Sequence, residues 1–196
     1  MKKLLIATAV VASFAAPQVF AQTAQSRNFE GFSAGVNANY AKTRASARAG
    51  NNSYSTDDTG TNGSIQGSYG IPLNDKVVMG IGATASFGDL DGGNFGGSSL
   101  KAKDMYSIYL EPGYRLTETT LVYGKLSYQS MKGEVSGLGS STFDGYGVGV
   151  GLRSMINSKF YVQAEVNEID YSSQSFNGLN VDPKQTIGTI GVGYKF

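Results

Sequence analysis

Five charged residues in the second half of the chain have side chains suited to acid–base chemistry or to ion pairing: Glu111, Arg115, Lys125, Arg153 and Glu165. The chain contains no His and no Cys. It therefore cannot supply an imidazole base, a thiol nucleophile or the usual ligands of a transition metal. A serine–lysine pair or a carboxylate pair remains open as a catalytic device. The same residues suit an interior network of charges that neutralise one another, and we favour this interpretation. We therefore predict no catalytic residues.

Two other groups of residues have types that bind ligands, and both have simpler explanations. Glycines alternate strictly over residues 145–151, but no helical pattern follows to present its N-terminus to a phosphate. Four aspartates in polar segments are of the type that binds calcium, yet we interpret them as solvated charges: Asp57, Asp58, Asp89 and Asp91. We predict no cofactor and no metal.

A short basic stretch consists of Lys42, Arg44 and Arg48, and it precedes Asp57 and Asp58. Basic residues on an exposed segment can contact the phosphates of lipopolysaccharide or the sulfates of glycans. They can also act as solubilising charges near lipid headgroups, and we favour this interpretation. Both interpretations stay open for this candidate surface-binding loop.

The elements that carry these residues show an alternation of apolar and polar side chains with a period of two, which is typical of β-strands. In residues 29–41, for example, Phe32, Val36 and Tyr40 share one face, while Asn37 and Asn39 lie on the other. The 27 Gly, 12 Tyr and 10 Phe also suit many short strands better than helices. Eight strands are predicted, at residues 29–41, 61–71, 77–87, 103–116, 120–130, 143–156, 159–170 and 186–196.

The connections between these strands alternate between long and short. Long polar loops are predicted at 42–60, 88–102, 131–142 and 171–184, and tight turns at 72–75, 117–119 and 157–158. An even number of strands with long loops at one end and short turns at the other is typical of outer-membrane barrels. The sequence therefore predicts an all-β fold: an eight-stranded antiparallel up-and-down transmembrane β-barrel with short periplasmic turns and four longer extracellular loops.

A membrane barrel differs from a soluble lipocalin-like barrel in which strand face points inward. In the soluble barrel, the apolar face would line a cavity. Here the charged residues share a face with Gly, Ser and Thr, which suits a closed interior, and alternating glycines would relieve crowding there. The aromatic residues of the apolar face fall into two groups at the strand ends, as in the girdles of membrane barrels. The periplasmic group is Phe32, Tyr69, Tyr114, Phe160, Tyr194 and Phe196, and the outer group is Tyr40, Phe87, Tyr106, Tyr128 and Tyr146.

Strand register makes the interior prediction more specific. If the turn at 117–119 pairs Tyr114 with Val122, then Glu111 lies directly opposite Lys125 on the inward face. In the next hairpin, Arg153 lies one diagonal step from Glu165.

The N-terminus predicts export. Lys2 and Lys3 precede an apolar run at 4–16 and small residues up to Ala21, which is the pattern of a cleaved signal peptide. The predicted organisation is a signal peptide at 1–21, a periplasmic N-terminal segment at 22–28 and an outer-membrane barrel domain at 29–196. Removal of the signal peptide leaves 14 basic against 15 acidic residues, a net charge of −1. Nucleic-acid binding, which needs a dense positive surface, is therefore not predicted.

Two segments resemble known outer-membrane proteins. The ending over residues 191–196, with Val192, Tyr194 and Phe196 on one face, resembles the C-terminal signal read by the barrel-assembly machinery. The hairpin formed by 106–116 and 121–128 is similar to the small barrels of the opacity and OmpX type, often grouped as porin-family proteins. The resemblance covers essentially the whole mature chain as a pattern, and it implies an outer-membrane location and contact with lipopolysaccharide.

The expected function is non-enzymatic, because the outer-membrane barrel families with lipase, acyltransferase or protease activity use a His that this chain lacks. We expect a monomer that acts as a structural or surface-interaction protein, in adhesion or envelope stability, through its extracellular loops. The ligand of those loops is not specified by their generic composition. The alternative is a narrow passive porin-like channel for ions or small solutes, although inward Tyr and Arg side chains would crowd its lumen.

Overall fold

The computed structural model describes residues 28–49, 52–88, 90–95, 98–135, 139–176 and 179–196. The predicted signal peptide lies outside these residues, as does the predicted periplasmic segment except Asn28. Ten strands form within the described residues: β1 (Gly31–Ala49), β2 (Asn52–Pro72), β3 (Val77–Phe87), β4 (Leu90–Phe95), β5 (Ser98–Arg115), β6 (Thr120–Val135), β7 (Gly139–Met155), β8 (Phe160–Tyr171), β9 (Gln174–Phe176) and β10 (Leu179–Lys195). None of the described residues forms a helix long and apolar enough to span a membrane.

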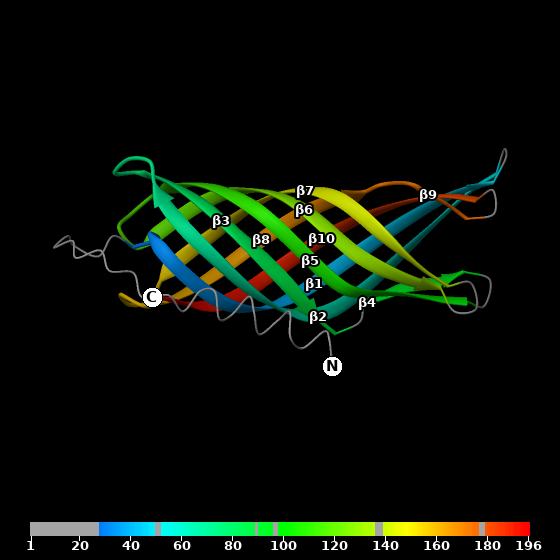
Figure 1. Ribbon diagram of the computed structural model, residues 1–196, viewed down its shortest axis with the longest axis horizontal. Helices are drawn as coiled ribbons and strands as arrows, with labels where there is room; N and C mark the ends of the chain where they lie inside the picture. Colours follow the sequence, from blue (N-terminus) through cyan, green and yellow to red (C-terminus); the bar gives the residue numbers. More distant parts are fainter. Residues whose placement is uncertain (1–27, 50–51, 89, 96–97, 136–138, 177–178) are drawn as a thin grey trace.

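Eight of these strands close a barrel (Figure 1). Its order is β1, β2, β3, β5, β6, β7, β8 and β10, and β10 returns to pair with β1. Every neighbouring pair is antiparallel. The short strands β4 and β9 pair only with β5 and β10 respectively, beyond the closed wall. The eight-stranded up-and-down barrel predicted from the alternation is therefore confirmed, including its closure by the last strand.

Alternating burial confirms the assignment of the two faces. Along β8, exposed and buried residues alternate without a break. The predicted register of the β5–β6 hairpin is also confirmed, because Tyr114 pairs with Val122 and Leu110 with Leu126. This register carries Glu111 opposite Lys125.

The predicted long loops differ from the structure, because most of their described residues continue the strands. β1 and β2 remain paired from Tyr40 and Thr61 up to Ala49 and Asn52, within the segment predicted as the first loop. Lys42 and Arg44 therefore lie on a strand and not in a loop. The reason is physical: beyond the apolar band both faces of a strand can meet water, so the hydrophobic alternation disappears while backbone hydrogen bonding continues.

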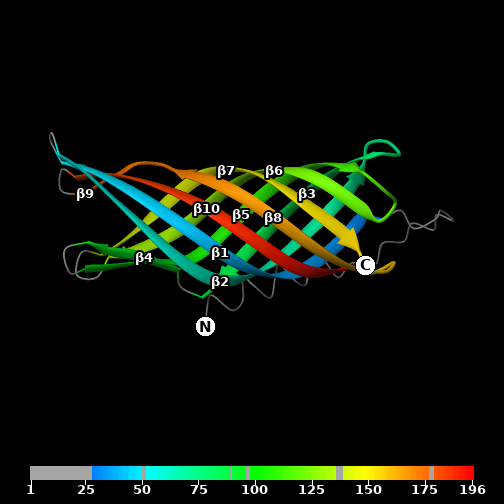
Figure 2. The same ribbon diagram turned by 180° about the vertical axis from the view of Figure 1, so that it is seen from behind.

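The outward surface carries an apolar band with aromatic residues at both ends. Ring contacts join neighbouring strands within each group, with centroids 4.6 Å apart for Phe32 and Tyr69 and 5.4 Å apart for Tyr128 and Tyr146. The C-terminus lies at the same end as the three tight turns, and β9 lies at the opposite end (Figures 1 and 2). This arrangement matches the two predicted girdles.

The barrel interior has three layers. An apolar cluster fills the turn end, and it consists of Phe29, Val78, Leu121, Tyr123, Met155 and Tyr161. A second fills the opposite end, and it consists of Ala41, Met105, Met131, Phe143, Ile169 and Tyr171. Between them lie buried polar and charged side chains, which form the candidate site.

Candidate functional site

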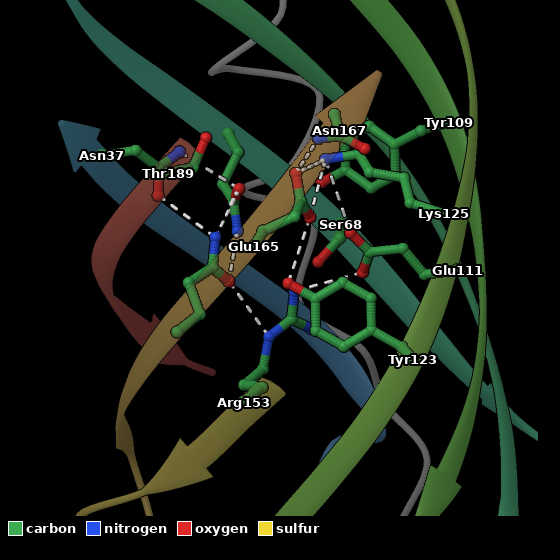
Figure 3. Close-up of polar contacts among 12 residues, drawn as sticks. Asn37, Ser68, Tyr109, Glu111, Tyr123, Lys125, Arg153, Glu165, Asn167 and Thr189 are labelled. Atoms are coloured by element: carbon green, nitrogen blue, oxygen red, sulfur yellow. Dashed lines mark hydrogen bonds and ion pairs between the residues drawn. The ribbon is translucent and has the colours of Figure 1, made fainter. Parts of the chain in front are cut away.

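Four of the predicted interior charges meet in one buried cluster, which we call the charge layer: Glu111, Lys125, Arg153 and Glu165 (Figure 3). The Nζ of Lys125 donates to the two carboxylate oxygens of Glu165 at 2.9 and 3.1 Å, and it lies 3.7 Å from Oε1 of Glu111. The Nη2 of Arg153 donates to Oε2 of Glu111 at 3.1 Å. All four side chains are at most 8% exposed.

The two closest ion pairs of the charge layer, Lys125 with Glu165 and Arg153 with Glu111, join strands that are not neighbours. Lys125 on β6 reaches Glu165 on β8, across β7. β7 permits this because the residue opposite Lys125 is Gly149 and the residue opposite Glu165 is Gly151. With hydrogen atoms in place of side chains there, the charged groups of β6 and β8 meet inside the barrel.

Polar side chains connect the charge layer to the opposite wall. The Nε of Arg153 donates to Oε1 of Gln163 at 3.1 Å. Gln163 and Gln66 exchange two amide hydrogen bonds of 3.0 Å, and Nε2 of Gln163 also donates to Oδ1 of Asn37 at 3.1 Å. The network therefore spans the lumen from β7 to β1 and β2.

Three inward tyrosines enclose the cations. The Nζ of Lys125 lies 4.1 Å from the ring centroid of Tyr109, and Cζ of Arg153 lies 5.2 and 5.0 Å from those of Tyr123 and Tyr161. These are cation–π distances. The hydroxyl of Tyr123 also donates to Oε2 of Glu165 at 3.1 Å.

Each of these tyrosines lies over a glycine of the next strand. The cross-strand pairs are Tyr109 with Gly82, Tyr123 with Gly151, and Tyr161 with Gly193. A Cβ at any of these glycines would collide with the facing ring. The alternating glycines therefore make room for the interior side chains, as the sequence predicts.

The charge layer has two cations and two carboxylates, so its charges balance. Removing ions from water is costly unless they are paired and hydrogen-bonded, and here each ion has both kinds of contact. The Nζ of Lys125 lies between two carboxylates, 2.9 Å from Glu165 and 3.7 Å from Glu111, so it is engaged within the network. This arrangement suits a structural network better than acid–base catalysis.

Small cavities lie on the two sides of the charge layer. One of about 20 Å³ is lined by Phe29, Glu111 and Arg153. Another of about 50 Å³ is lined by Asn39, Lys125 and Glu165. Since one water needs roughly 10–15 Å³, the smaller cavity has room for one or two waters and the larger for a few, with the charge layer between them.

Arg115 does not join the charge layer, although the sequence groups it with the other four charges. It lies four residues from Glu111 on the same face of β5, about 13 Å further along the strand. There Nη2 pairs with Oε1 of Glu30 at 2.5 Å, and Nη1 donates to the carbonyl of Asp75 at 3.0 Å. Arg115 therefore ties the turn end of the barrel together.

Phe29 is predicted as the first residue of the strand at 29–41, but in the structure it lies before that strand. It precedes β1 in a turn, has a φ of 72° and is 8% exposed within the cluster at the turn end. Its carbonyl occupies the space that a Cβ on Gly70 would need, and the neighbouring Asn28 donates from Nδ2 to the carbonyl of Glu118 at 2.8 Å. The sequence does not indicate this turn, because residues other than glycine rarely adopt a left-handed φ.

The basic stretch is paired with acid. Lys42 and Arg44 lie 3.1 and 3.0 Å from the two carboxylate oxygens of Asp57. Hydrogen bonds from Arg44 and then Lys42 hold the pKa of Asp57 below its usual value.

The other charged residues that the sequence singles out are only partly described. The side chains of Arg48 and Asp91, and Asp89 as a whole, lie outside the described part of the structure. Asp58 accepts a hydrogen bond from the backbone of Thr59 at 2.7 Å. Within the described residues, no group of three or more acidic side chains is placed to hold a metal.

The C-terminal residues lie on the outward face of the closing strand. Val192 is 53% and Phe196 77% exposed, and the ring of Tyr194 lies 5.1 Å from those of Phe160 and Phe196. The backbone N–H of Phe196 donates to the carbonyl of Phe32 at 3.0 Å. The last residue is thus fixed to the first strand of the barrel.

Comparison with known proteins identifies the family of this fold. The family described as outer membrane protein beta-barrel domain matches residues 6–196. No curated protein matches the chain.

Among solved structures, a similar one is Ail, the attachment invasion locus protein of Yersinia pestis, in complex with the heparin analogue sucrose octasulfate. It is 17% identical with a TM-score of 0.52, over 85% of this chain and 99% of Ail. Others are Neisserial surface protein A, at 17% identity and a TM-score of 0.47 over 82% and 97% of the two chains, and OprG from Pseudomonas aeruginosa, at 13% and 0.49 over 87% and 98%. Because the family match covers almost the entire chain, this protein belongs to the outer membrane protein beta-barrel domain family, and the membrane that its apolar band faces is the outer membrane.

Proposed function

We propose that this protein is a non-enzymatic structural and surface-interaction barrel whose recognition surface is the set of strand extensions beyond the outer girdle. The charge layer is the observation that carries this proposal. Its buried ion pairs and tyrosines fill the lumen of the barrel, so the interior serves stability. Binding then belongs to the outside of the molecule.

The strand extensions suit recognition because they are rigid. β1 and β2 pair continuously over nine residues beyond Tyr40 and Thr61, and β6 and β7 pair from Tyr128 and Tyr146 up to Val135 and Gly139. A paired ribbon presents its side chains with less loss of conformational entropy on binding than a disordered loop does. This supports surface interaction, whether with a host ligand or with the surrounding envelope.

The channel alternative has less support. Conduction needs a continuous aqueous path, and the charge layer lies between the cavities at the two ends. Eight strands leave an interior just wide enough for side chains. We therefore propose that the barrel does not conduct ions.

Register-preserving shortening of the extensions tests this function. Ala45 pairs with Thr56, so residues 45–56 can be replaced by an Asn-Gly turn that keeps Arg44 opposite Asp57. Gly133 pairs with Ser141, so residues 133–141 can be replaced in the same way to shorten the ribbon on the other side of the barrel.

Binding of the producing cells to host matrix and serum ligands, and their detergent sensitivity, are then measured, with heat-modifiable electrophoretic mobility as the check on folding. We expect one shortened ribbon to lose a binding or resistance phenotype while the barrel stays folded. The proposal fails if both shortened barrels are folded and all phenotypes persist.

A further inference from the structure

The outward face of β8, β10, β1 and β2 changes from apolar to charged over three successive cross-strand rows. The girdle row contains Val166, Gly188, Tyr40 and Thr61. The lower charged row, two residues further along each strand, contains Glu168, Thr186, Lys42 and Thr59. The upper charged row contains Asp170, Lys184, Arg44 and Asp57. All eight residues of the two charged rows are exposed.

The lower charged row lies at the height of the lipid headgroups, and the upper charged row lies just above them. Two residues of a strand span about 6.6 Å, which a tilt of about 35–45° reduces to roughly 5 Å along the membrane normal. The charged rows therefore lie about 5 and 10 Å above the Tyr40 row. The headgroup region adds about 5–8 Å to each side of the hydrocarbon core, and long basic side chains can reach into it from slightly above.

Two cations lie directly opposite each other in the upper charged row. Arg44 on β1 pairs in register with Lys184 on β10, and both side chains are more than half exposed, at 59% and 58%. Like charges in this position are destabilising. Asp57 and Asp170 contact the outer sides of the pair, at 3.0 Å from Arg44 and 2.7 Å from Lys184. Each cation is thus already paired with an exposed carboxylate, and an anion that enters the space between the two cations must take the place of these ion pairs.

A third cation and a hydroxyl lie just below this pair. Lys42 is two residues from Arg44 on the same face of β1 and is 49% exposed. It is directly opposite Thr186 of β10. Three positive charges and a hydrogen-bond donor therefore lie on one patch of the β1–β10 seam, beside the three carboxylates of Asp57, Glu168 and Asp170.

We propose that Lys42, Arg44 and Lys184 bind a phosphate group of an outer-leaflet glycolipid, the phosphorylated lipid A of lipopolysaccharide, at the seam where the first and last strands close the barrel. This inference rests on the proposed function, because it names one ligand class for the outer surface. The position of the patch favours a lipid over a soluble sulfated glycan. It lies on the side wall directly above the apolar band, whereas a soluble glycan would first meet the tips of the extensions.

A lipid phosphate at this seam would also act as a clamp. It would contact β1 and β10 together, so its binding would oppose separation of the strands that close the barrel. Binding to the folded barrel alone must raise its resistance to unfolding.

The test uses the full barrel in detergent micelles and measures binding of bisphosphorylated lipid A by native mass spectrometry, with enzymatically dephosphorylated lipid A as the second probe. The variant is Arg44→Gln with Lys184→Gln. Its matched control replaces one cation at the periplasmic turn, Lys76→Gln. A second variant, Asp57→Asn with Asp170→Asn, removes the carboxylates that compete with the phosphate. Heat-modifiable mobility checks that each variant is folded.

We expect the double glutamine variant to bind lipid A about tenfold more weakly, since two cations near a membrane surface contribute at least this much. The double asparagine variant should bind severalfold more tightly, and Lys76→Gln should match the wild type. Dephosphorylated lipid A should bind every variant equally weakly.

The inference is overturned if the glutamine variant binds bisphosphorylated lipid A as the wild type does. It is also overturned if a sulfated oligosaccharide binds the patch more tightly than lipid A. Neither result removes the proposed function, which depends on the shortened ribbons and not on this patch.

Discussion

The charge layer and the charged rows contain the same kinds of side chain in opposite environments. In the charge layer, Lys125 and Glu165 are 8% and 3% exposed. In the upper charged row, Arg44 and Asp57 are 59% and 45% exposed, although their N–O separation of 3.0 Å is close to the 2.9 Å of the buried pair. Distance alone therefore does not separate a structural ion pair from a functional one. Burial does, because solvent screens the exposed pair and leaves its ions free to exchange partners.

Removal of Lys125 should produce the largest effect and test this contrast most strongly. Lys125→Met leaves Glu165 without its cation in the barrel interior, and an unpaired buried charge typically destabilises by about 3–5 kcal/mol. Urea unfolding in detergent, followed by electrophoretic mobility, measures the loss. The matched control is Lys42→Met, which removes an exposed lysine bound to one carboxylate and should leave the midpoint almost unchanged.

The double replacement Lys125→Met with Glu165→Met sharpens the same comparison. It removes both ions, so it should restore much of the stability lost in the single variant. Equal loss of stability from Lys125→Met and Lys42→Met would contradict the distinction between the two regions.

The glycine positions give the next largest effect. Gly151→Ala places a methyl group against the ring of Tyr123, and overpacking of this kind costs about 1–3 kcal/mol. Gly124→Ala is the control on the outward face, where the nearest atoms lie 3.9 Å away. The unfolding midpoint should fall for Gly151→Ala only, and a similar fall in both would show that Tyr123 does not limit the space.

Deletion of Phe196 tests whether an outward residue contributes to assembly of the barrel rather than to the stability of its folded state. Phe196 and Tyr146 are about equally exposed, at 77% and 73%, so loss of lipid contact alone predicts equal effects. If the barrel-assembly machinery reads Phe196, its deletion should lower the heat-modifiable fraction in cells severalfold, while Tyr146→Ala should have little effect. Normal assembly of the truncated chain would refute this role for Phe196.

The smallest expected effect is a pH dependence at the exposed Asp57. Its pKa is lowered by Arg44 and then Lys42, so this ion pair contributes fully above the unfolded value of about 3.9 and is lost as pH falls through the lower folded value. NMR titration should give a midpoint below about 3.9 that returns toward it in Arg44→Gln. An unchanged midpoint in that variant would exclude Arg44 as the dominant cause.

Sequence alternation predicts the local part of the structure well. Strand faces, the closure of 186–196 on the first strand and the Tyr114–Val122 register follow from period-two patterns and turn lengths, because these depend on neighbouring strands. The upper ends of the strands are not predicted, because the residues beyond the membrane are polar on both faces and show no alternation of apolar and polar side chains.

The interior partners are harder to predict because they cross the lumen. Arg153 is predicted one diagonal step from Glu165, and the register agrees, since Arg153 pairs with Gln163. It nevertheless forms its ion pair with Glu111 on β5, across β6, and this contact depends on the curvature of the barrel. Phe29 is wrongly predicted to lie in the first strand for a different reason, since its left-handed backbone conformation leaves no trace in the hydrophobic pattern.

The central claim is that the charge layer closes the lumen, and planar-bilayer recording tests it most directly. The wild-type barrel should show no steady conductance, whereas replacing Glu111, Lys125, Arg153 and Glu165 together with alanine should open a measurable leak in barrels that remain folded. Steady conductance through the wild-type barrel that Glu111→Gln or Arg153→Gln abolishes would contradict the account and favour a channel.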